Sequence, residues 1–153
     1  MTHEVSLQIA RPRGMAAVRA HLAYSQVPQK FAQYLDQVYA AAREHALSLD
    51  GQNIFVYFPR GDGTADIDFG VGARSPFEQH GNVTYKAVPT GEVAGATHWG
   101  AYTGLGAAHQ DIIAWCKTQR RALAGPSWEV YGHWSEDPAR VRTDIYYLLE
   151  PPA

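Results

Sequence analysis

The sequence predicts an α+β fold made by tandem duplication of one strand–strand–helix–strand–strand unit, with antiparallel sheets and two long helices. Several short segments alternate apolar and polar residues, which is the period of a half-buried strand. Two longer segments carry apolar residues at helical spacing. The order of segments occurs twice, on either side of a loop at residues 72–81. We expect a single domain over residues 1–153, with repeats at 1–71 and 82–153 and a ligand groove on their pseudo-twofold axis.

Turn-forming residues separate the elements of the first repeat. Pro28 suits the first turn of a helix, where its missing N–H would have no partner. Gly61 and Gly63 favour a hairpin turn, and Asp66 and Asp68 are expected on the surface of the strand that follows. The expected elements are strands at 5–9 and 15–22, a helix from residue 27 that Gly51 ends, and strands at 53–58 and 66–71.

The second repeat follows the same plan. The expected elements are strands at 83–87 and 92–99, a helix from about residue 105 to near 123, a turn at Gly125-Pro126, and strands at 128–134 and 142–149. The residues that we match between the repeats are Pro12 with Pro89, Gly14 with Gly91, Ala17 with Ala94, His21 with His98, and Asp66–Phe69 with Asp144–Tyr147. Phe55 matches Glu129, so an aromatic ring in one repeat stands where the other has a carboxylate, both facing the axis.

Composition narrows the class of protein. The net charge is −2 and no block of basic residues occurs, so nothing indicates nucleic-acid binding. The single cysteine, Cys116, cannot form an internal disulfide and lies in an apolar helical pattern. The first residues lack the pattern of a signal peptide, and no apolar run is long enough to span a bilayer. We expect a cytoplasmic protein without a membrane partner.

Glu129 is the most unusual residue of the sequence, because it lies in a strand rich in aromatic side chains. Strand alternation places Glu129, Tyr131 and His133 on one face, and Trp128 and Trp134 on the other. A buried charge without a partner is costly, so such a carboxylate is normally paired or hydrogen-bonded. The alternative is an exposed glutamate that happens to lie near aromatic residues, and the strand alone leaves both interpretations open.

Three segments of the second repeat carry a family pattern: His98-Trp99-Gly100-Ala101-Tyr102-Thr103-Gly104-Leu105, Trp128-Glu129-Val130-Tyr131 and Thr143-Asp144-Ile145-Tyr146-Tyr147-Leu148-Leu149. In order and spacing they resemble the GyrI-like small-molecule-binding domain, also found as the effector-binding domain of some bacterial transcription activators. The resemblance implies a duplicated α+β fold with a cleft, in which Glu129 contacts cationic aromatic ligands. Asp144 stands where the family often has a longer glutamate, which leaves its role open. The chain resembles a stand-alone form without a DNA-binding domain.

The candidate ligand-binding residues are Glu129, Tyr131, Phe55, Tyr57, Tyr102, His98 and Trp99. Aromatic faces attract cations, and a carboxylate compensates the charge. We therefore expect binding or sequestration of small cationic or aromatic compounds. Two alternatives from the resemblance are a hydrolase of reactive cyclopropanoid aromatics, with Glu129 as a general base, and a protein-interaction module such as a gyrase inhibitor.

Ordinary structural roles are alternatives for several of these residues. Tyr57 and Tyr131 are equally consistent with core packing, and His21 and His98 with hydrogen-bonded strand histidines. The seven histidines and one cysteine show no metal-ligand spacing, so no metal is expected. A haem-binding family has a similar duplicated architecture, but only His45 could serve as the axial ligand on the first helix, and we expect no cofactor.

Overall fold

A computed structural model describes residues 3–152, and this range contains eight β-strands and two α-helices. The chain divides into two units. We call Pro12–Val88 the N-terminal unit, and the chain from Pro89 onward, together with the segment up to Arg11, the C-terminal unit. Each unit contains one helix and four antiparallel strands, so the α+β class and the two long helices are confirmed.

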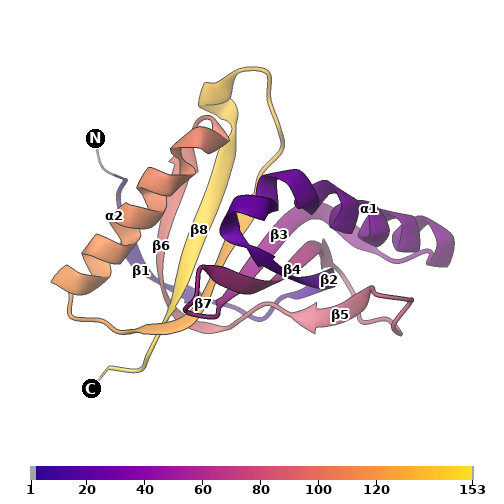
Figure 1. The fold of residues 1–153 in the computed structure, drawn as a ribbon, viewed down its shortest axis with the longest axis horizontal. Helices are drawn as coiled ribbons and strands as arrows, with labels where there is room; N and C mark the ends of the chain where they lie inside the picture. Colours follow the sequence, from indigo (N-terminus) through magenta and orange to yellow (C-terminus); the bar gives the residue numbers. More distant parts are fainter. Residues whose placement is uncertain (1–2, 153) are drawn as a thin grey trace. The chain divides into compact units, whose positions relative to one another are not determined.

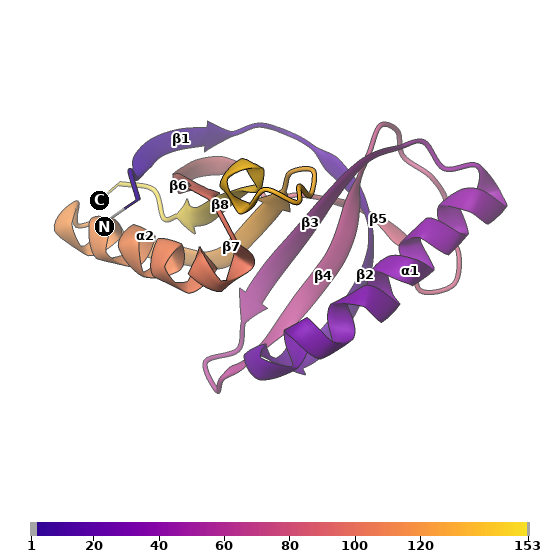
Figure 2. The same ribbon diagram turned by 90° about the horizontal axis from the view of Figure 1, so that it is seen from above.

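In the N-terminal unit, α1 lies along one face of four strands in the order β3-β4-β2-β5 (Figures 1 and 2). Val18, Phe69 and Phe55 lie side by side across neighbouring strands and are buried, as are Leu35 and Val38 of the helix. Burial of each such side chain contributes about 1.5–3 kcal/mol. The elements are β2 (Gly14–Ala23), η1 (Tyr24–Gln26), α1 (Val27–His45), β3 (Leu49–Pro59), β4 (Thr64–Ala73) and β5 (Thr84–Ala87).

In the C-terminal unit, α2 packs on four strands in the order β1-β6-β8-β7. Ile112 and Cys116 of the helix form one apolar cluster with Ala96 of β6 and with Ile145 and Leu149 of β8. The elements are β1 (Ser6–Ala10), β6 (Gly91–Trp99), η2 (Tyr102–Gly104), α2 (Leu105–Thr118), β7 (Leu123–Tyr131), η3 (Pro138–Arg140) and β8 (Arg142–Leu149).

The first strand of each half of the sequence joins the sheet of the other half. β1 pairs with β6, and β5 pairs with β2. The compact units therefore do not coincide with the sequence halves at 1–71 and 82–153. The division of the sequence into two repeats at these bounds stays a prediction. Within each unit the strand order is the same, since β7-β8-β6-β1 corresponds position by position to β3-β4-β2-β5.

Two glycines lie inside strands, although the sequence analysis assigned Gly51 to the end of a helix and Gly125 to a turn. α1 ends at His45, followed by Ala46 in the left-handed conformation, and β3 has already begun at Leu49. Gly51 lies at a register shift of β3 with a φ of 79°, so it does not end the helix. Gly125, with a φ of 120°, lies at the equivalent shift of β7, so Gly125-Pro126 is not a turn between elements. In both cases the glycine permits a strand irregularity, which composition cannot distinguish from a turn.

The strand ladders also correct how the repeats align. The pair of Val18 and Phe69, which lie opposite each other, corresponds to the pair of Ala96 and Ile145 in the other unit. Counting along these strands places Ala20, and not His21, at the position of His98. The four β2–β6 matches from the sequence are thus one residue out of step, and the β4–β8 matches are two residues out. In β2 and β6, identical residue types were therefore matched across positions whose side chains point to opposite faces. The correspondence of Phe55 with Glu129 holds, because both strand irregularities also align.

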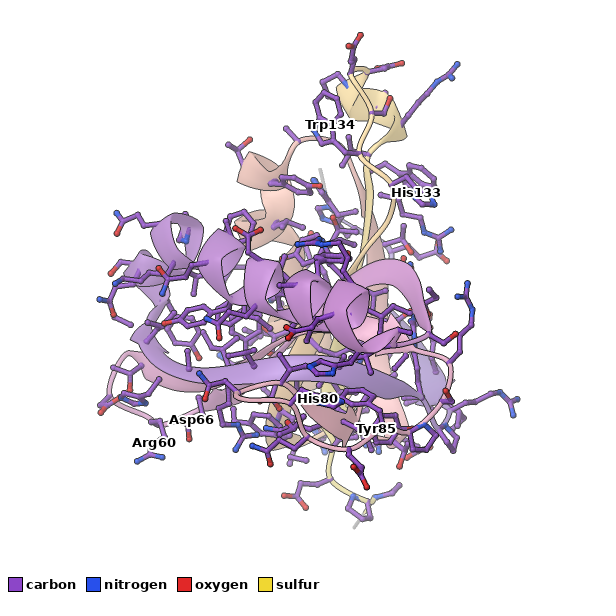
Figure 3. The ribbon with its side chains drawn as sticks, turned by 90° about the vertical axis from the view of Figure 1, so that its right-hand side faces the viewer. Arg60, Asp66, His80, Tyr85, His133 and Trp134 are labelled. Atoms are coloured by element: carbon purple, nitrogen blue, oxygen red, sulfur yellow. The ribbon has the colours of Figure 1, made fainter. Side chains whose placement is uncertain are left out.

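Asp68 is buried, which contradicts its predicted place on the surface. It is 2% exposed, and its carboxylate accepts hydrogen bonds from Arg19 Nε at 2.8 Å and Nη2 at 3.0 Å, and from Lys86 Nζ at 2.9 Å. Charge-assisted bonds of this kind offset the cost of burying the carboxylate. Asp66 is less buried and pairs with Arg60 at 2.9 Å (Figure 3).

Among residues 3–152, neither helix is both long and apolar enough to cross a membrane.

Candidate functional site

A buried carboxylate lies in the C-terminal unit on the strand face that packs against α2. Glu129 of β7 is 5% exposed and pairs across the ladder with Ile145, a member of the α2 cluster. The hydroxyl of Tyr131 donates to Glu129 Oε1 at 2.6 Å, and His109 Nε2 lies 2.9 Å from Oε2. Glu129 and Tyr131 are two residues apart, so strand alternation puts both on one face as predicted. The interpretation of Glu129 as an exposed glutamate is wrong.

His109 extends this arrangement to a second strand. Its Nδ1 lies 2.7 Å from the hydroxyl of Tyr147 on β8, while its Nε2 contacts Glu129. A carboxylate only accepts hydrogen bonds, so Nε2 carries a proton. The result is a continuous chain from Glu129 through His109 to Tyr147, in which a carboxylate, an imidazole and a phenol lie within hydrogen-bonding distance.

Tyr102 connects the buried carboxylate to the surface of the unit. It lies in the short helix η2 before α2 and is 45% exposed. Its ring meets the half-buried ring of Tyr131 edge to face, with 5.8 Å between centroids. Because Tyr131 also donates to Glu129, aromatic surface leads from the exposed Tyr102 to the carboxylate. This combination of π faces and a carboxylate favours a ligand that is aromatic, cationic or both.

The N-terminal unit holds apolar residues at the positions of all three polar groups. Counting from the first residue of each helix, Phe31 corresponds to His109, and the ring of Phe31 contacts Phe55 at 5.8 Å between centroids. Phe55 corresponds to Glu129, and the strand ladders align the buried Val71 with Tyr147. The N-terminal unit thus has the same arrangement of elements with apolar side chains at these three positions. The packing of the fold therefore does not require the carboxylate–imidazole–phenol group.

Phe55 and Tyr57, the two candidates in the N-terminal unit, take part in aromatic contacts there. Phe55 is buried and its ring meets Phe69 edge to face at 4.9 Å. Tyr57 is stacked with Tyr24 at 6.1 Å, and these two residues occupy the positions of Tyr131 and Tyr102. A role of Phe55 and Tyr57 in ligand binding stays a prediction.

His98 and Trp99 differ in their surroundings. His98 is buried, and both ring nitrogens have partners at 2.9 Å, His3 Nε2 and the carbonyl oxygen of Ala101. Its ring also lies where a side chain at Gly104 would have to be, 2.5 Å from that ideal Cβ position. These contacts match the structural alternative for His98. Trp99 is 57% exposed, with the guanidinium of Arg142 5.6 Å from its ring centroid, so it is available at the surface.

Asp144 lies on the other face of the sheet from Glu129. It pairs across the ladders with Val130 and Thr97, and its Oδ1 accepts from Thr97 Oγ1 at 2.7 Å and from Arg142 Nε at 3.0 Å. Its counterpart in the N-terminal unit is Asp68, which also accepts hydrogen bonds from its neighbours. The hydrogen bond with Thr97 joins Asp144 of β8 to the neighbouring strand β6.

Sequence reasoning missed His109. The residue lies in the helix between apolar positions, and its spacing gives no sign that it faces a strand carboxylate 20 residues later. Aligning the first turns of the two helices would have found it, because the apolar Phe31 then stands opposite a histidine. For residues 3–152, no group of three or more His, Cys, Asp or Glu side chains is arranged to hold a metal ion.

Comparisons with known proteins agree with the fold. Among solved structures, the C-terminal domain of EcmrR superposes with a TM-score of 0.77 at 17% identity, over 98% of this chain and 99% of that one. SAV2435, solved bound to tetraphenylphosphonium, has a TM-score of 0.68 at 12% identity, over 96% and 94% of the two chains. A hydrolase from Listeria innocua has a TM-score of 0.65 at 10% identity, over 97% and 93%.

No curated protein matches the sequence. A family model does match it, over residues 4–150, and describes a GyrI-like small-molecule-binding domain. The match spans nearly the whole chain and both repeats. The chain therefore belongs to the GyrI-like family of small-molecule-binding domains.

Proposed function

We propose that the protein binds small cationic aromatic compounds against Glu129 and the rings of Tyr131 and Tyr102. The observation that carries this proposal is a 5% exposed carboxylate joined to an aromatic pair that reaches the surface. Each good contact between a cation and a ring contributes about 0.5–2 kcal/mol, and the carboxylate adds charge compensation. SAV2435, with the same fold, was solved with such a compound, tetraphenylphosphonium.

The predicted affinity is modest and the predicted range of ligands broad. Aromatic walls recognise shape with few directional contacts, so compounds of similar size and charge bind with similar strength. The carboxylate then discriminates by charge. A cation should bind more tightly than a neutral compound of matched shape, and removing the charge of Glu129 should abolish most of that difference.

The test is a titration of intrinsic tryptophan fluorescence with tetraphenylphosphonium and with neutral triphenylphosphine oxide. Glu129→Gln keeps the shape of the side chain, and we expect it to weaken binding of the cation at least about tenfold, or about 1.4 kcal/mol, with little change for the neutral compound. Glu136→Gln, at an exposed position after β7, is the matched control for a lost charge. Equal cation affinity in the wild type and Glu129→Gln would refute the proposal.

Hydrolysis of reactive aromatic electrophiles, such as cyclopropanoid compounds, is a second candidate function. The chain from Glu129 through His109 to Tyr147 favours it, because it supplies both a proton acceptor and a proton donor. The water oxygen would bond to the strained ring carbon as its carbon–carbon bond opens, and it would keep one proton as the new hydroxyl group. Its other proton would go to the site, and the site would give one proton to the leaving carbon. Mass spectrometry should show a gain of one water, which Glu129→Gln would abolish. Unchanged substrate with wild-type protein would exclude this function.

A further inference from the structure

The two hydrogen-bond partners of His109 are compatible with both charge states of its imidazole. Nε2 must donate to the carboxylate of Glu129, so it is protonated in either state. Nδ1 faces the hydroxyl of Tyr147 at 2.7 Å. A hydroxyl can donate or accept, so this contact persists whether the imidazole is neutral and accepts, or is protonated and donates. The site can therefore hold His109 in both forms without rearranging.

The protonated form supplies Glu129 with a counter-ion from inside the protein. An imidazolium 2.9 Å from Oε2 compensates the negative charge that would attract a cationic ligand. The neutral form leaves that charge in place. Because Glu129 is buried, solvent screens this competition little.

We propose that His109 couples the binding of cationic ligands to the loss of a proton. Cations bind to the state in which His109 is neutral, and protonation of His109 weakens their binding. This inference rests on the proposed binding of cations at Glu129 and specifies how that site is regulated. By linkage, the affinity for a cation rises with pH, by at most tenfold per pH unit, and the bound cation in turn favours the neutral imidazole.

Other titratable groups lie in the same network as His109, and their effect on the pH dependence has to be separated from that of His109. Glu129 on β7 and Tyr147 on β8 lie within hydrogen-bonding distance of His109. Tyr131 contacts Glu129, and the exposed Tyr102 contacts Tyr131. Imidazoles in model peptides titrate near pH 6.5, carboxyl groups near 4 and phenols near 10. A window from pH 6 to 8 therefore reports mainly on histidines. Substitutions of His109 then separate its contribution from that of the other histidines.

The N-terminal unit supplies the most informative substitution. Phe31 occupies the position of His109, so His109→Phe copies a side chain that the fold already accommodates. His109→Gln is the second variant, since it keeps a donor for Glu129 but cannot become charged. His133→Gln, at an exposed position after β7 (Figure 3), is the control for loss of a histidine elsewhere in the unit.

The experiment measures tetraphenylphosphonium and triphenylphosphine oxide affinities at pH 6, 7 and 8. For the wild type and His133→Gln we expect cation affinity to rise about fivefold or more across this window, with no change for the neutral compound. For His109→Phe and His109→Gln the cation affinity should not vary with pH. In the wild type, saturating tetraphenylphosphonium should also shift the NMR titration of the His109 ring to lower pH.

The possible negative results distinguish a failure of the proton coupling from a failure of the proposed binding site. If the wild type binds the cation with the same affinity at all three pH values, or if both His109 variants keep the wild-type slope, the coupling is refuted while the binding site stands. If tetraphenylphosphonium does not bind the wild type at any pH, the proposed function itself is refuted, and the coupling with it. An unmoved His109 titration in the presence of bound cation would also overturn the coupling.

Discussion

Residues 3–152 contain two buried carboxylates, and these are compensated in different ways. Asp68 has two permanently charged partners, Arg19 and Lys86. The partners of Glu129 include a phenol and an imidazole, and the charge of the imidazole can change. Fixed pairing suits a residue that holds strands together. Pairing with a titratable group suits a residue that exchanges partners when a ligand arrives, which is the basis of both proposals.

Thr143 is a buried polar residue whose hydroxyl group lacks a hydrogen-bond partner among the described residues. It is 0% exposed. The equivalent position in the N-terminal unit is the buried Ile67. We expect Thr143→Val to stabilise the protein by about 1 kcal/mol, because it removes an unsatisfied hydroxyl at almost constant shape.

Urea unfolding of wild-type protein and Thr143→Val would measure this effect as a shift of the midpoint. Thr143→Ser is the control, since it keeps the hydroxyl and loses a methyl group, and it should be destabilised by about 1 kcal/mol. A Thr143→Val protein less stable than the wild type would mean that the hydroxyl has a stabilising partner.

At the level of elements, the end of α1 carries conformational strain. Ala46 caps the helix with a φ of 54°, in the left-handed region, and its N–H donates to the carbonyl of Ala42. Glycine is the usual residue at this position, because a Cβ is disfavoured there. The helix ends here because the chain reverses into β3, and the alanine shows that the stop does not depend on the best capping residue.

Ala46→Gly should therefore stabilise the protein by about 0.5–1 kcal/mol, despite the larger entropy of glycine in the unfolded chain. The matched control is Ala40→Gly, at an exposed position inside α1, where the same substitution should destabilise by about 1 kcal/mol. Thermal unfolding of both variants tests the prediction. Two changes of the same sign would show that the conformation of Ala46 is not the cause.

At the level of the whole molecule, the exchange of first strands makes the segment up to Arg11 part of the C-terminal unit. β1 is paired with β6, and His3 is attached to α2. The backbone N–H of His3 and its Nδ1 both lie 2.8 Å from Oδ2 of Asp111. The hydrogen bond from this backbone N–H, followed by the one from the ring, lowers the pKa of Asp111 below its ordinary value of 3.8.

This pKa shift has a consequence for stability at different pH values. Because the pKa is lower in the folded protein, the ionised Asp111 stabilises the fold above pH 3.8, and the contribution is lost as the pH falls through the lowered value. Asp111→Asn should be less stable than wild type at pH 5–7, and this difference should shrink toward pH 3. Urea midpoints across this range, with the exposed Asp36→Asn as control, measure it. A difference that does not vary with pH would refute the assignment.

Much of the fold follows from local pattern. The closing strand at 142–149 has the predicted bounds, and the start of α1 at Val27 is correct. Period and turn chemistry act within a few residues, so they can be interpreted from a single segment. They failed at Gly51 and Gly125, because a glycine in a strand irregularity looks like a glycine in a turn. They also failed at Asp68, whose compensating charges come from β2 and β5.

The sequence by itself determined the class of fold, the duplicated order of elements, and the common face of Glu129 and Tyr131, since each depends on periodicity along one chain segment. Only the tertiary structure decided that the first strands are exchanged and that His109 meets Glu129 and Tyr147. Those contacts join residues from separate elements. Their distances are fixed by how a helix and strands pack, which no local pattern encodes.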